Sequence, residues 1–246
     1  MDRMLYVAMT GAKETLRAQT VNNHNIANVS TTGFRADLAA FQSRAVDGSG
    51  YASRVYATNG TTGFNDNNGP LQTTGRDLDI AITGKGWIAV QGPDGREAYT
   101  RAGNLQVDAD GNLMTATGRP VLGDGAPINI PPYTSIFFAR DGSISIVAQG
   151  QTPDTTATVG RIKLVNPAED QIERGDDGLF RMKDGSDAPA EASVGISSGV
   201  LESSNVNAAE AMVNMIELSR QFEMQVKAIR TAEENAASAA QIMRIG

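Results

Sequence analysis

The sequence predicts an α+β protein in which N- and C-terminal coiled-coil-like helices pack together, with a central antiparallel all-β domain inserted between them. Both ends of the 246-residue chain carry apolar residues at alternating spacings of four and three, which is the heptad pattern of packed helices. The middle contains six Asp-Gly pairs separated by short runs of branched and aromatic residues, a pattern typical of β-hairpins. The periodicity therefore changes from helical to strand-like and back to helical.

The N-terminal helix is expected within residues 1–33. Its heptad positions are Leu5, Met9, Ala12, Leu16, Gln19, Asn23 and Ile26. Small polar residues then follow from Asn28 to Thr32, and their side chains can bond the last helical backbone groups. Gly33 permits a sharp change of chain direction, so that Phe34 begins a new segment.

Residues 34–74 are rich in Gly, Asn, Thr and Ser and have no helical period, so an extended or loosely ordered connector is predicted. The central β domain follows over residues 75–196. Its turns are predicted at Asp94-Gly95, Asp110-Gly111, Asp124-Gly125, Asp141-Gly142, Asp177-Gly178 and Asp184-Gly185. Its strands are predicted at Trp87–Gln91, Tyr99–Arg101, Leu105–Val107, Ser135–Ala139, Ser143–Val147, Arg161–Val165 and Leu179–Met182.

The C-terminal helix is placed in residues 197–246, with Ser203, Ser204 and Asn205 as candidate N-caps. Its heptad positions continue over about five heptads. They are Ala208, Met212, Met215, Ser219, Phe222, Val226, Ile229, Glu233, Ala236, Ala240 and Met243.

Composition excludes several function classes. The net charge of -7 gives the chain no overall attraction to nucleic acid or anionic lipid. No apolar run is long enough to span a bilayer, and the N-terminus lacks the compact apolar core of a cleaved signal peptide. Because cysteine is absent, disulfides and thiolate metal sites are excluded.

The apolar stripes of the two terminal helices are narrow. Burying Leu5, Met9, Leu16 and Ile26 would contribute roughly 6–12 kcal/mol, whereas ordering the backbone costs roughly 1–2 kcal/mol per residue. The N-terminal helix therefore requires a partner surface. That partner is either the C-terminal helix of the same chain, giving a two-helix stalk, or helices of many subunits packed together.

Two stretches at opposite ends resemble the signatures of the bacterial flagellar rod and hook family. They are NNHNIANVSTTGFRAD at residues 22–37 and SGVLESSNVNAAEAMVNMIELSRQFEMQVKAIRTAEE at residues 198–234. The stretch LDIAITGKGWIAVQGPDGREAYTRAGNLQVDADGNL, from Leu78, is similar to the central domain of proximal-rod members of that family. The resemblance therefore covers nearly the whole chain.

The resemblance implies a structural, non-enzymatic subunit of the periplasmic proximal rod of the flagellar basal body, without a cofactor or metal. It implies export by the flagellar type III apparatus, without a cleaved signal peptide. The implied partners are inner rod subunits, the distal-rod protein and further copies of the chain. A distal-rod or hook-type protein of the same family is the alternative.

The resemblance also implies a set of subunit-interface residues at both ends of the chain. Their contribution would be to shape the exits from the helices and to pack against neighbouring subunits. They are Leu5, Met9, Leu16, Asn25, Asn28, Gly33, Phe34, Arg35, Gly199, Leu201, Glu202, Asn205, Val206, Met215, Phe222, Val226 and Ile229.

A carbohydrate-active β-domain enzyme is the alternative from a different class, because such enzymes use paired carboxylates. The candidate pairs Asp77/Asp79 and Asp176/Asp177 lie beside turns, where solvated acids are common. A calcium loop starting at Asp108 is excluded, because its sixth position is Leu113 and its twelfth is Arg119. The other chemical motifs are equally weak: GKGW, residues 84–87, lacks phosphate-loop spacing, and a triad built on the single histidine, His24, would lie at a helix end.

Overall fold

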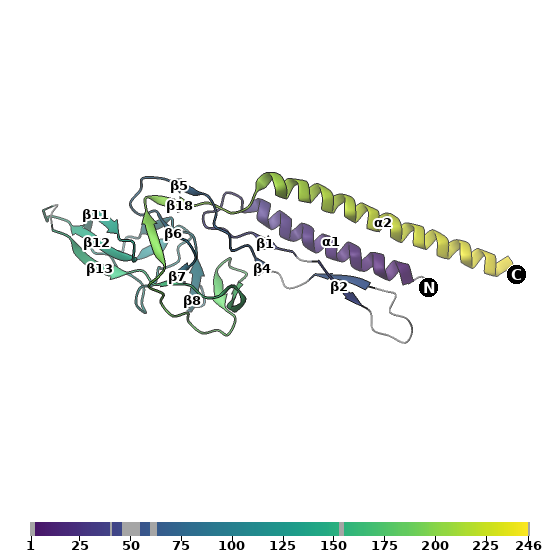
Figure 1. The fold of residues 1–246 in the computed structure, drawn as a ribbon, viewed down its shortest axis with the longest axis horizontal. Helices are drawn as coiled ribbons and strands as arrows, with labels where there is room; N and C mark the ends of the chain where they lie inside the picture. Colours follow the sequence, from purple (N-terminus) through teal and green to yellow (C-terminus); the bar gives the residue numbers. More distant parts are fainter. Residues whose placement is uncertain (1–2, 40, 46–54, 60–62, 153–154, 246) are drawn as a thin grey trace. The chain divides into compact units, whose positions relative to one another are not determined.

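The computed structural model describes residues 3–39, 41–45, 55–59, 63–152 and 155–245, and the chain divides into two compact units (Figure 1). The helical unit comprises Met1–Val29, Ala36–Asn65 and Val206–Gly246. The β unit comprises Ser30–Arg35 and Asp66–Asn205. The predicted order of helix, antiparallel β region and helix is confirmed.

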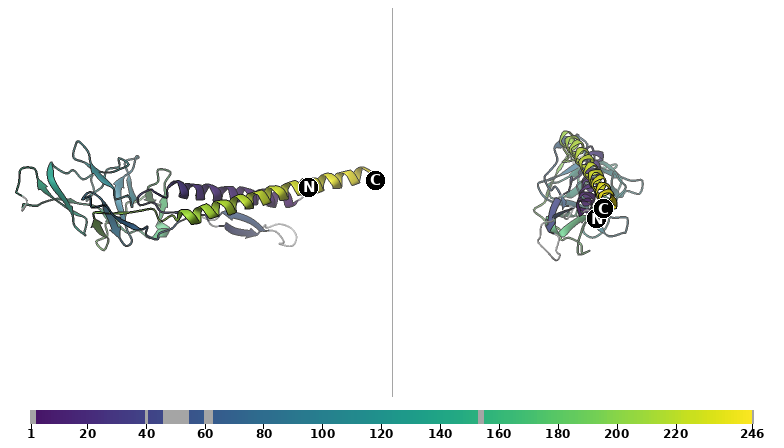
Figure 2. Two further views of the ribbon diagram at one scale, coloured as in Figure 1. Left: turned by 90° about the horizontal axis from the view of Figure 1, so that it is seen from above. Right: turned by 90° about the vertical axis from the view of Figure 1, so that its right-hand side faces the viewer.

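The helical unit is built on α1 (Arg3–Ala27) and α2 (Ala208–Ile245), which lie side by side and run antiparallel (Figures 1 and 2). Antiparallel strand pairs accompany the helices. They are β1 (Asp37–Leu38) with β4 (Gly63–Phe64), and β2 (Phe41–Ala45) with β3 (Val55–Asn59). The segment expected to be an extended connector thus contains paired strands. Within the described residues, neither helix is apolar enough over a sufficient length to cross a bilayer.

Small residues of α1 form most of its buried face. Its buried positions include Ala8, Ala12, Thr15, Ala18 and Asn22. The contact with α2 is close, because a Cβ at Gly11 would lie 3.0 Å from the side chain of Gln225. This face includes Ala12 of the predicted heptad stripe but not Met9 and Leu16, which are exposed although that stripe places them against the partner helix. Small side chains let two helix backbones approach closely, which turns these larger residues outward.

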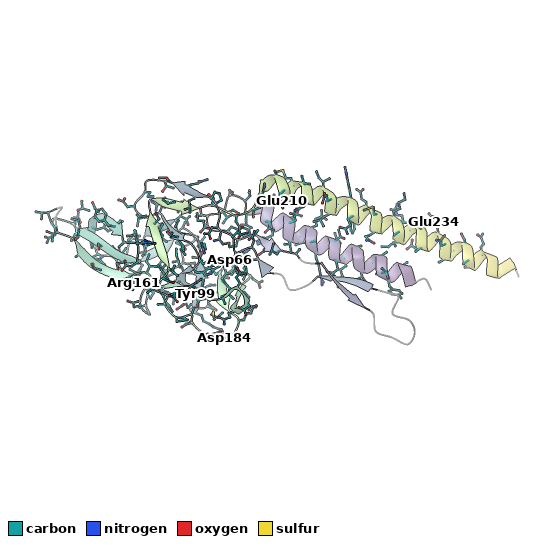
Figure 3. The ribbon with its side chains drawn as sticks, viewed as in Figure 1. Asp66, Tyr99, Arg161, Asp184, Glu210 and Glu234 are labelled. Atoms are coloured by element: carbon teal, nitrogen blue, oxygen red, sulfur yellow. The ribbon has the colours of Figure 1, made fainter. Side chains whose placement is uncertain are left out.

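On α2 most positions that are buried or half-buried also alternate by four and three, but the predicted heptad positions Met212, Ser219 and Glu233 are exposed. The alternating positions are Ala211, Met215, Leu218, Phe222, Gln225, Ile229 and Ala232, and Ala208, Val226 and Ala228 are half-buried beside them. The exposed side of the helix carries Glu210 and Glu234, labelled in Figure 3. The helix begins after Asn207, whose Oδ1 accepts from the N–H groups of Ala209 (3.1 Å) and Glu210 (3.4 Å).

The predicted N-caps Ser203, Ser204 and Asn205 therefore lie before the helix. Strand β18 occupies Val200–Glu202, and the Ser203 N–H donates to the Pro70 carbonyl at 2.9 Å. Because their backbone groups pair with other strands and loops, residues 197–207 are strand, turn and irregular chain and do not belong to the helix predicted to contain them.

The β unit consists of small antiparallel sheets. Its main sheet has the order β14-β7-β8-β16-β15, a second sheet has the order β11-β12-β13, and three pairs are β17-β6, β18-β5 and β10-β9. The elements are β5 (Leu71–Thr73), β6 (Ile80–Thr83), β7 (Trp87–Gln91), β8 (Glu97–Thr100), β9 (Leu105–Val107), β10 (Leu113–Thr115), β11 (Tyr133–Phe138), β12 (Ser143–Ala148), β13 (Ala157–Arg161), β14 (Leu164–Val165), η1 (Glu169–Gln171), β15 (Ile172–Arg174), β16 (Phe180–Met182), β17 (Gly195–Ser198) and β18.

One apolar core joins these sheets, except the β18-β5 pair, which contributes no residue to it. Its fully buried members include Ile80, Ile88, Leu105, Leu113 and Ile144, which come from β6, β7, β9, β10 and β12. Side chains of this size contribute roughly 1.5–3 kcal/mol each when removed from water. The β unit is therefore a self-contained hydrophobic assembly of short strands.

The Asp-Gly pairs form the turns between these strands. All six glycines have φ between +73° and +99°, while no described non-glycine residue has a positive φ. At several turns the aspartate carboxylate also accepts a backbone N–H two residues later, as Asp141 does from Ser143 at 3.1 Å. Asp177, one of the acids considered as a catalytic pair in the sequence, thus has a turn-forming role, since it accepts from the Leu179 N–H at 3.2 Å.

Asp177→Asn is expected to lower stability at pH 7 by about 0.5–1 kcal/mol, because its carboxylate forms two hydrogen bonds with Arg181, at 2.9 and 2.7 Å. The Arg181 hydrogen bonds hold the pKa of Asp177 below its usual value, against an opposing effect of burial. The stabilisation is therefore present above the unfolded pKa of about 3.9 and is lost as pH falls through the lower folded pKa. Urea unfolding from pH 7 to pH 2 checks this, and a difference that persists unchanged at pH 2 contradicts it.

Candidate subunit interface

The two signature stretches of the sequence meet in the β unit. The Gly33 N–H donates to the Glu202 carbonyl at 2.8 Å, and the Asn205 N–H donates to the Phe34 carbonyl at 3.2 Å. The segment that follows α1 in the chain is therefore bonded to the segment that precedes α2. Both segments belong to the β unit and not to the helical unit.

Their side chains form a buried ion cluster, which we call the joint cluster: Arg35, Asn68, Arg101 and Glu202. Glu202 accepts from Arg35 Nη1 at 2.7 Å and from Arg101 Nη1 at 3.1 Å. The Gly69 N–H also donates to Glu202, at 2.9 Å. Asn68 Oδ1 accepts from both guanidinium groups, each at 3.1 Å.

The joint cluster carries an excess of positive charge in a dry environment. The side chains of Arg35 and Arg101 are 0% exposed and that of Glu202 is 1% exposed. Burial, and then the charge of Arg35, lower the pKa of the Arg101 guanidinium, while Glu202 opposes this change. Among the described contacts Glu202 is the one carboxylate bonded to both guanidinium groups, and the charge of Asp66 acts on Arg101 in the same direction without a bond.

Phe34 of the first signature packs on the β unit at one end of a row of aromatic rings and guanidinium groups. The Arg174 guanidinium lies 4.6 Å from the Phe34 ring centre and 4.8 Å from that of Phe180. Phe180 in turn contacts the Trp87 ring, with centroids 4.4 Å apart. Arg101 lies 5.4 Å from the Trp87 ring centre, which connects this row to the joint cluster.

The asparagine-rich end of α1 makes specific bonds within the helical unit. Asn22 Nδ2 donates to the Ala211 carbonyl of α2 at 2.8 Å. The Asn25 amide forms two hydrogen bonds with the backbone of Asp37, at 2.9 and 2.8 Å. Asn28 Nδ2 donates back to the His24 carbonyl at 2.9 Å. These asparagines fix the helix end to its surroundings through directed backbone bonds.

Large apolar side chains remain exposed on the outward sides of both helices. They are Tyr6 (56%), Val7 (37%), Met9 (52%), Leu16 (47%), Met212 (52%), Val213 (54%), Ile216 (52%) and Met224 (63%). Singly exposed apolar residues are common, but eight on one helix pair indicate a surface for protein contact.

The residues expected at a subunit interface fall into three environments. Met9 and Leu16 are exposed, and Leu5, Met215, Phe222, Val226 and Ile229 are half-buried. Asn25, Asn28, Phe34, Gly199, Leu201, Asn205 and Val206 are also half-buried. Gly33, Arg35 and Glu202 are buried within the chain itself, so the Gly33 backbone and the side chains of Arg35 and Glu202 have partners without another subunit. Their role as interface residues stays a prediction.

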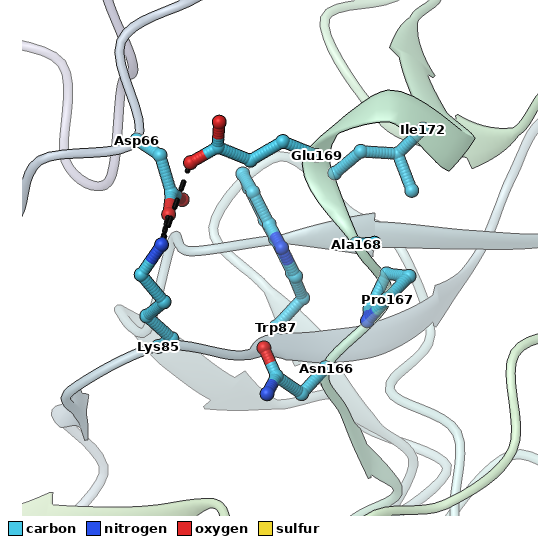
Figure 4. A pocket seen from close by; sticks show the side chains of 8 residues that line it. All are labelled: Asp66, Lys85, Trp87, Asn166, Pro167, Ala168, Glu169 and Ile172. Atoms are coloured by element: carbon cyan, nitrogen blue, oxygen red, sulfur yellow. Dashed lines mark hydrogen bonds and ion pairs between the residues drawn. The ribbon is translucent and has the colours of Figure 1, made fainter.

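A small pocket of about 270 Å³ opens on the β unit beside Trp87 (Figure 4). Lys85 lies across it and forms ion pairs with Asp66 at 2.7 Å and with Glu169 at 3.4 Å. Burial opposes the ionisation of Asp66, but its bond to Lys85 and the positive charges of Lys85 and Arg101 prevail and lower the pKa of Asp66. A general acid needs the opposite shift, so Asp66 does not have the properties of a glycosidase general acid.

The acid pairs considered in the sequence have structural contacts. Asp79 is 4% exposed and forms an ion pair with Arg76 at 3.5 Å, and Asp177 is held by Arg181. Within the part of the chain that the structure describes, no group of three or more His, Cys, Asp or Glu side chains has the arrangement of a metal site.

Sequence reasoning missed two members of the joint cluster, Asn68 and Arg101. Arg101 directly follows β8 and lies two residues after the buried Tyr99, so strand alternation alone would place it on the same inward side. Asn68 carries no comparable signal, because it lies in a polar stretch whose pairing depends on the distant Arg35 and Arg101.

Comparison with known proteins gives concordant matches along the chain. The family described as Flagella basal body rod protein matches residues 5–35, the Flagellar hook protein FlgE/F/G D1 domain matches residues 81–151, and the Flagellar basal body rod FlgEFG protein C-terminal matches residues 197–242. The flagellar basal-body rod protein FlgF of Salmonella typhimurium is 45% identical over 249 residues, covering 99% of both chains.

Two further relatives extend this comparison. FlgF of Escherichia coli K12 is 43% identical, again over 99% of both chains. The flagellar basal-body rod protein FlgG of Bacillus subtilis is 34% identical, over 95% of this chain and 96% of its own.

Proposed function

Since the chain belongs to the flagellar basal-body rod protein family, it is a structural, non-enzymatic subunit of the rod, and we propose that it assembles through the apolar outer faces of α1 and α2. The higher identity to the two FlgF proteins than to the FlgG protein favours a proximal-rod subunit over the distal-rod or hook-type alternative. Assembly with other rod proteins in the basal body follows from the family.

The exposed apolar faces carry this proposal. Eight described side chains of α1 and α2 are roughly half exposed in the free chain. Completing their burial against neighbouring helices would stabilise the assembled state by about 6–12 kcal/mol. On α1 the close contact with α2 uses small residues instead, and on α2 it uses a different face from the one that carries Met212, Val213 and Ile216, so this apolar surface is left available.

We propose coiled-coil-like packing of these helices with further copies of the chain, with inner rod subunits and with the distal-rod protein. The proposed location is the periplasmic part of the rod, reached through the flagellar type III apparatus. Chain ends that gain a buried surface only on assembly suit both export and assembly. They can pass a narrow export channel unfolded and become ordered afterwards, when they pack against neighbouring subunits.

Limited proteolysis of the free protein tests the coupling of folding to assembly. Protease is expected to remove roughly the first 30 and the last 45 residues and to leave a resistant β unit, because the helices of the free chain bury few large side chains. Mass spectrometry of the fragments gives the cleavage positions, and the rod-assembled protein provides the protected control. Full helical content and uncleaved ends in a dilute monomer would overturn the proposal.

A further inference from the structure

The joint cluster draws its members from separate parts of the chain, all within the β unit. Arg35 ends the segment that follows α1, Glu202 ends β18 before α2, and Arg101 follows β8. The first two belong to the two signature stretches, and the third belongs to neither. Every hydrogen bond of this cluster described above is therefore independent of the packing of α1 on α2.

Glu202 has a unique charge role in this cluster. It is the only carboxylate bonded to the buried guanidinium groups of Arg35 and Arg101 among the described contacts. Without it, two like charges would remain close together in a dry environment, which is strongly unfavourable. Its own backbone carbonyl also accepts from Gly33. The side chain and the backbone carbonyl of Glu202 thus both bind the first signature segment, through Arg35 and Gly33.

We propose that Glu202 is a positioning residue that holds both signature segments on the β unit before the helices assemble. In the free subunit the joint cluster is then already formed, and the chain leads from it back to α1 and forward to α2. This inference rests on the proposed function for the unassembled state of the helices. The joint itself requires only the contacts of the β unit.

Hydrogen exchange of the full-length monomer, read by mass spectrometry, tests the joint. Peptides covering residues 30–35 and 199–205 are expected to exchange slowly even where the helices exchange fast. Glu202→Gln is expected to accelerate exchange in both peptides together by at least about 100-fold, as the removal of one partner from a buried ion pair implies. The exposed Glu173→Gln, in the same unit, is the matched control and should leave both unchanged.

Arg35→Met gives a second, milder variant, because Glu202 keeps its bond to Arg101 and no buried carboxylate is left unpaired. It should accelerate exchange in residues 30–35 and leave residues 199–205 and the β12 core protected. If Glu202→Gln unfolds the whole β unit, exchange in Arg35→Met decides whether the contacts of Glu202 hold the segment of residues 30–35. Fast exchange of both peptides in the unmodified protein, or an unchanged residue 30–35 peptide in Arg35→Met, would overturn the inference.

Exchange in different peptides tests the two proposals, namely coupled folding and assembly of the helices and the positioning role of Glu202. Slow exchange throughout α1 and α2 in the monomer would contradict coupled folding and assembly, yet would leave the Glu202 comparison valid. Fast exchange at the joint would contradict the joint alone.

Discussion

Ile216→Asp is expected to abolish incorporation into the rod while leaving the β unit folded. Ile216 is 52% exposed in the free chain, so aspartate there meets water and should change fold stability by no more than about 0.5 kcal/mol. In the rod, the same carboxylate would be removed from water at a cost of several kcal/mol. Incorporation should fall by at least about 100-fold. Complementation of a strain lacking the subunit, read as swimming and as isolated basal bodies with complete rods, measures this.

Asn214→Asp is the matched control for this variant. It introduces the same charge two residues away, at an exposed polar position on another side of α2. Swimming should be retained. Val226→Asp and Ile229→Lys lie at half-buried positions and should also stop assembly, although they disturb the contact with α1 as well. Normal swimming by Ile216→Asp would contradict assembly through the outer apolar face.

Gly33→Ala is expected to destabilise the β unit by about 3 kcal/mol or more. Gly33 has a φ of +69°, a conformation that costs roughly 1–2 kcal/mol for an L side chain. In addition, a Cβ at this position would lie 2.3 Å from the backbone carbon of Arg101, and a backbone atom cannot rotate away. The chain must shift at the joint cluster to accommodate the methyl group. Unfolding in urea, followed by the fluorescence of Trp87, the single tryptophan, measures the loss.

Gly75→Ala separates the cost of a positive φ from the cost of the close approach to the Arg101 backbone. Gly75 has a nearly identical φ of +71°, but no heavy atom lies within 4 Å of the position that a Cβ would occupy there. Its substitution should therefore cost only the conformational part, about 1–2 kcal/mol. Equal losses for Gly33→Ala and Gly75→Ala would show that the close approach to Arg101 has no energetic consequence.

The order of helix, β region and helix, and several of the strands, could be predicted from the sequence because local chemistry determines them. An Asp-Gly pair supplies both a turn-forming carboxylate and a residue that tolerates positive φ, and each of the six pairs forms a turn in the structure. Strands such as Trp87–Gln91 and Leu105–Val107 lie between these turns with the predicted bounds.

The contact face of α1 could not be predicted from the same kind of pattern. A heptad reading gives weight to large apolar residues and therefore selects Met9 and Leu16, which are exposed. The buried face consists of small residues such as Ala8 and Ala18, which have little apolar surface of their own. Their suitability depends on the distance to α2, and a single helix sequence does not contain that distance.

The candidate interface was only partly accessible to sequence reasoning for a related reason. The family resemblance selects Arg35 and Glu202, but it does not show that they bond each other. Their partners Arg101 and Asn68 come from loops whose meeting point depends on the complete arrangement of the sheets. Pairing of this kind is a property of tertiary structure.

The bond between Arg35 and Glu202 also constrains the order in which the β unit can be completed. The two residues are 167 positions apart, and β5 and β6 likewise pair with β18 and β17 near the end of the unit. Contacts of such high sequence separation form only after a large loop has closed, which favours folding in milliseconds to seconds instead of microseconds. In a chain that emerges N-terminus first, the segment that contains Arg35 can therefore form its bond to Glu202 only after β18, the last strand, has emerged.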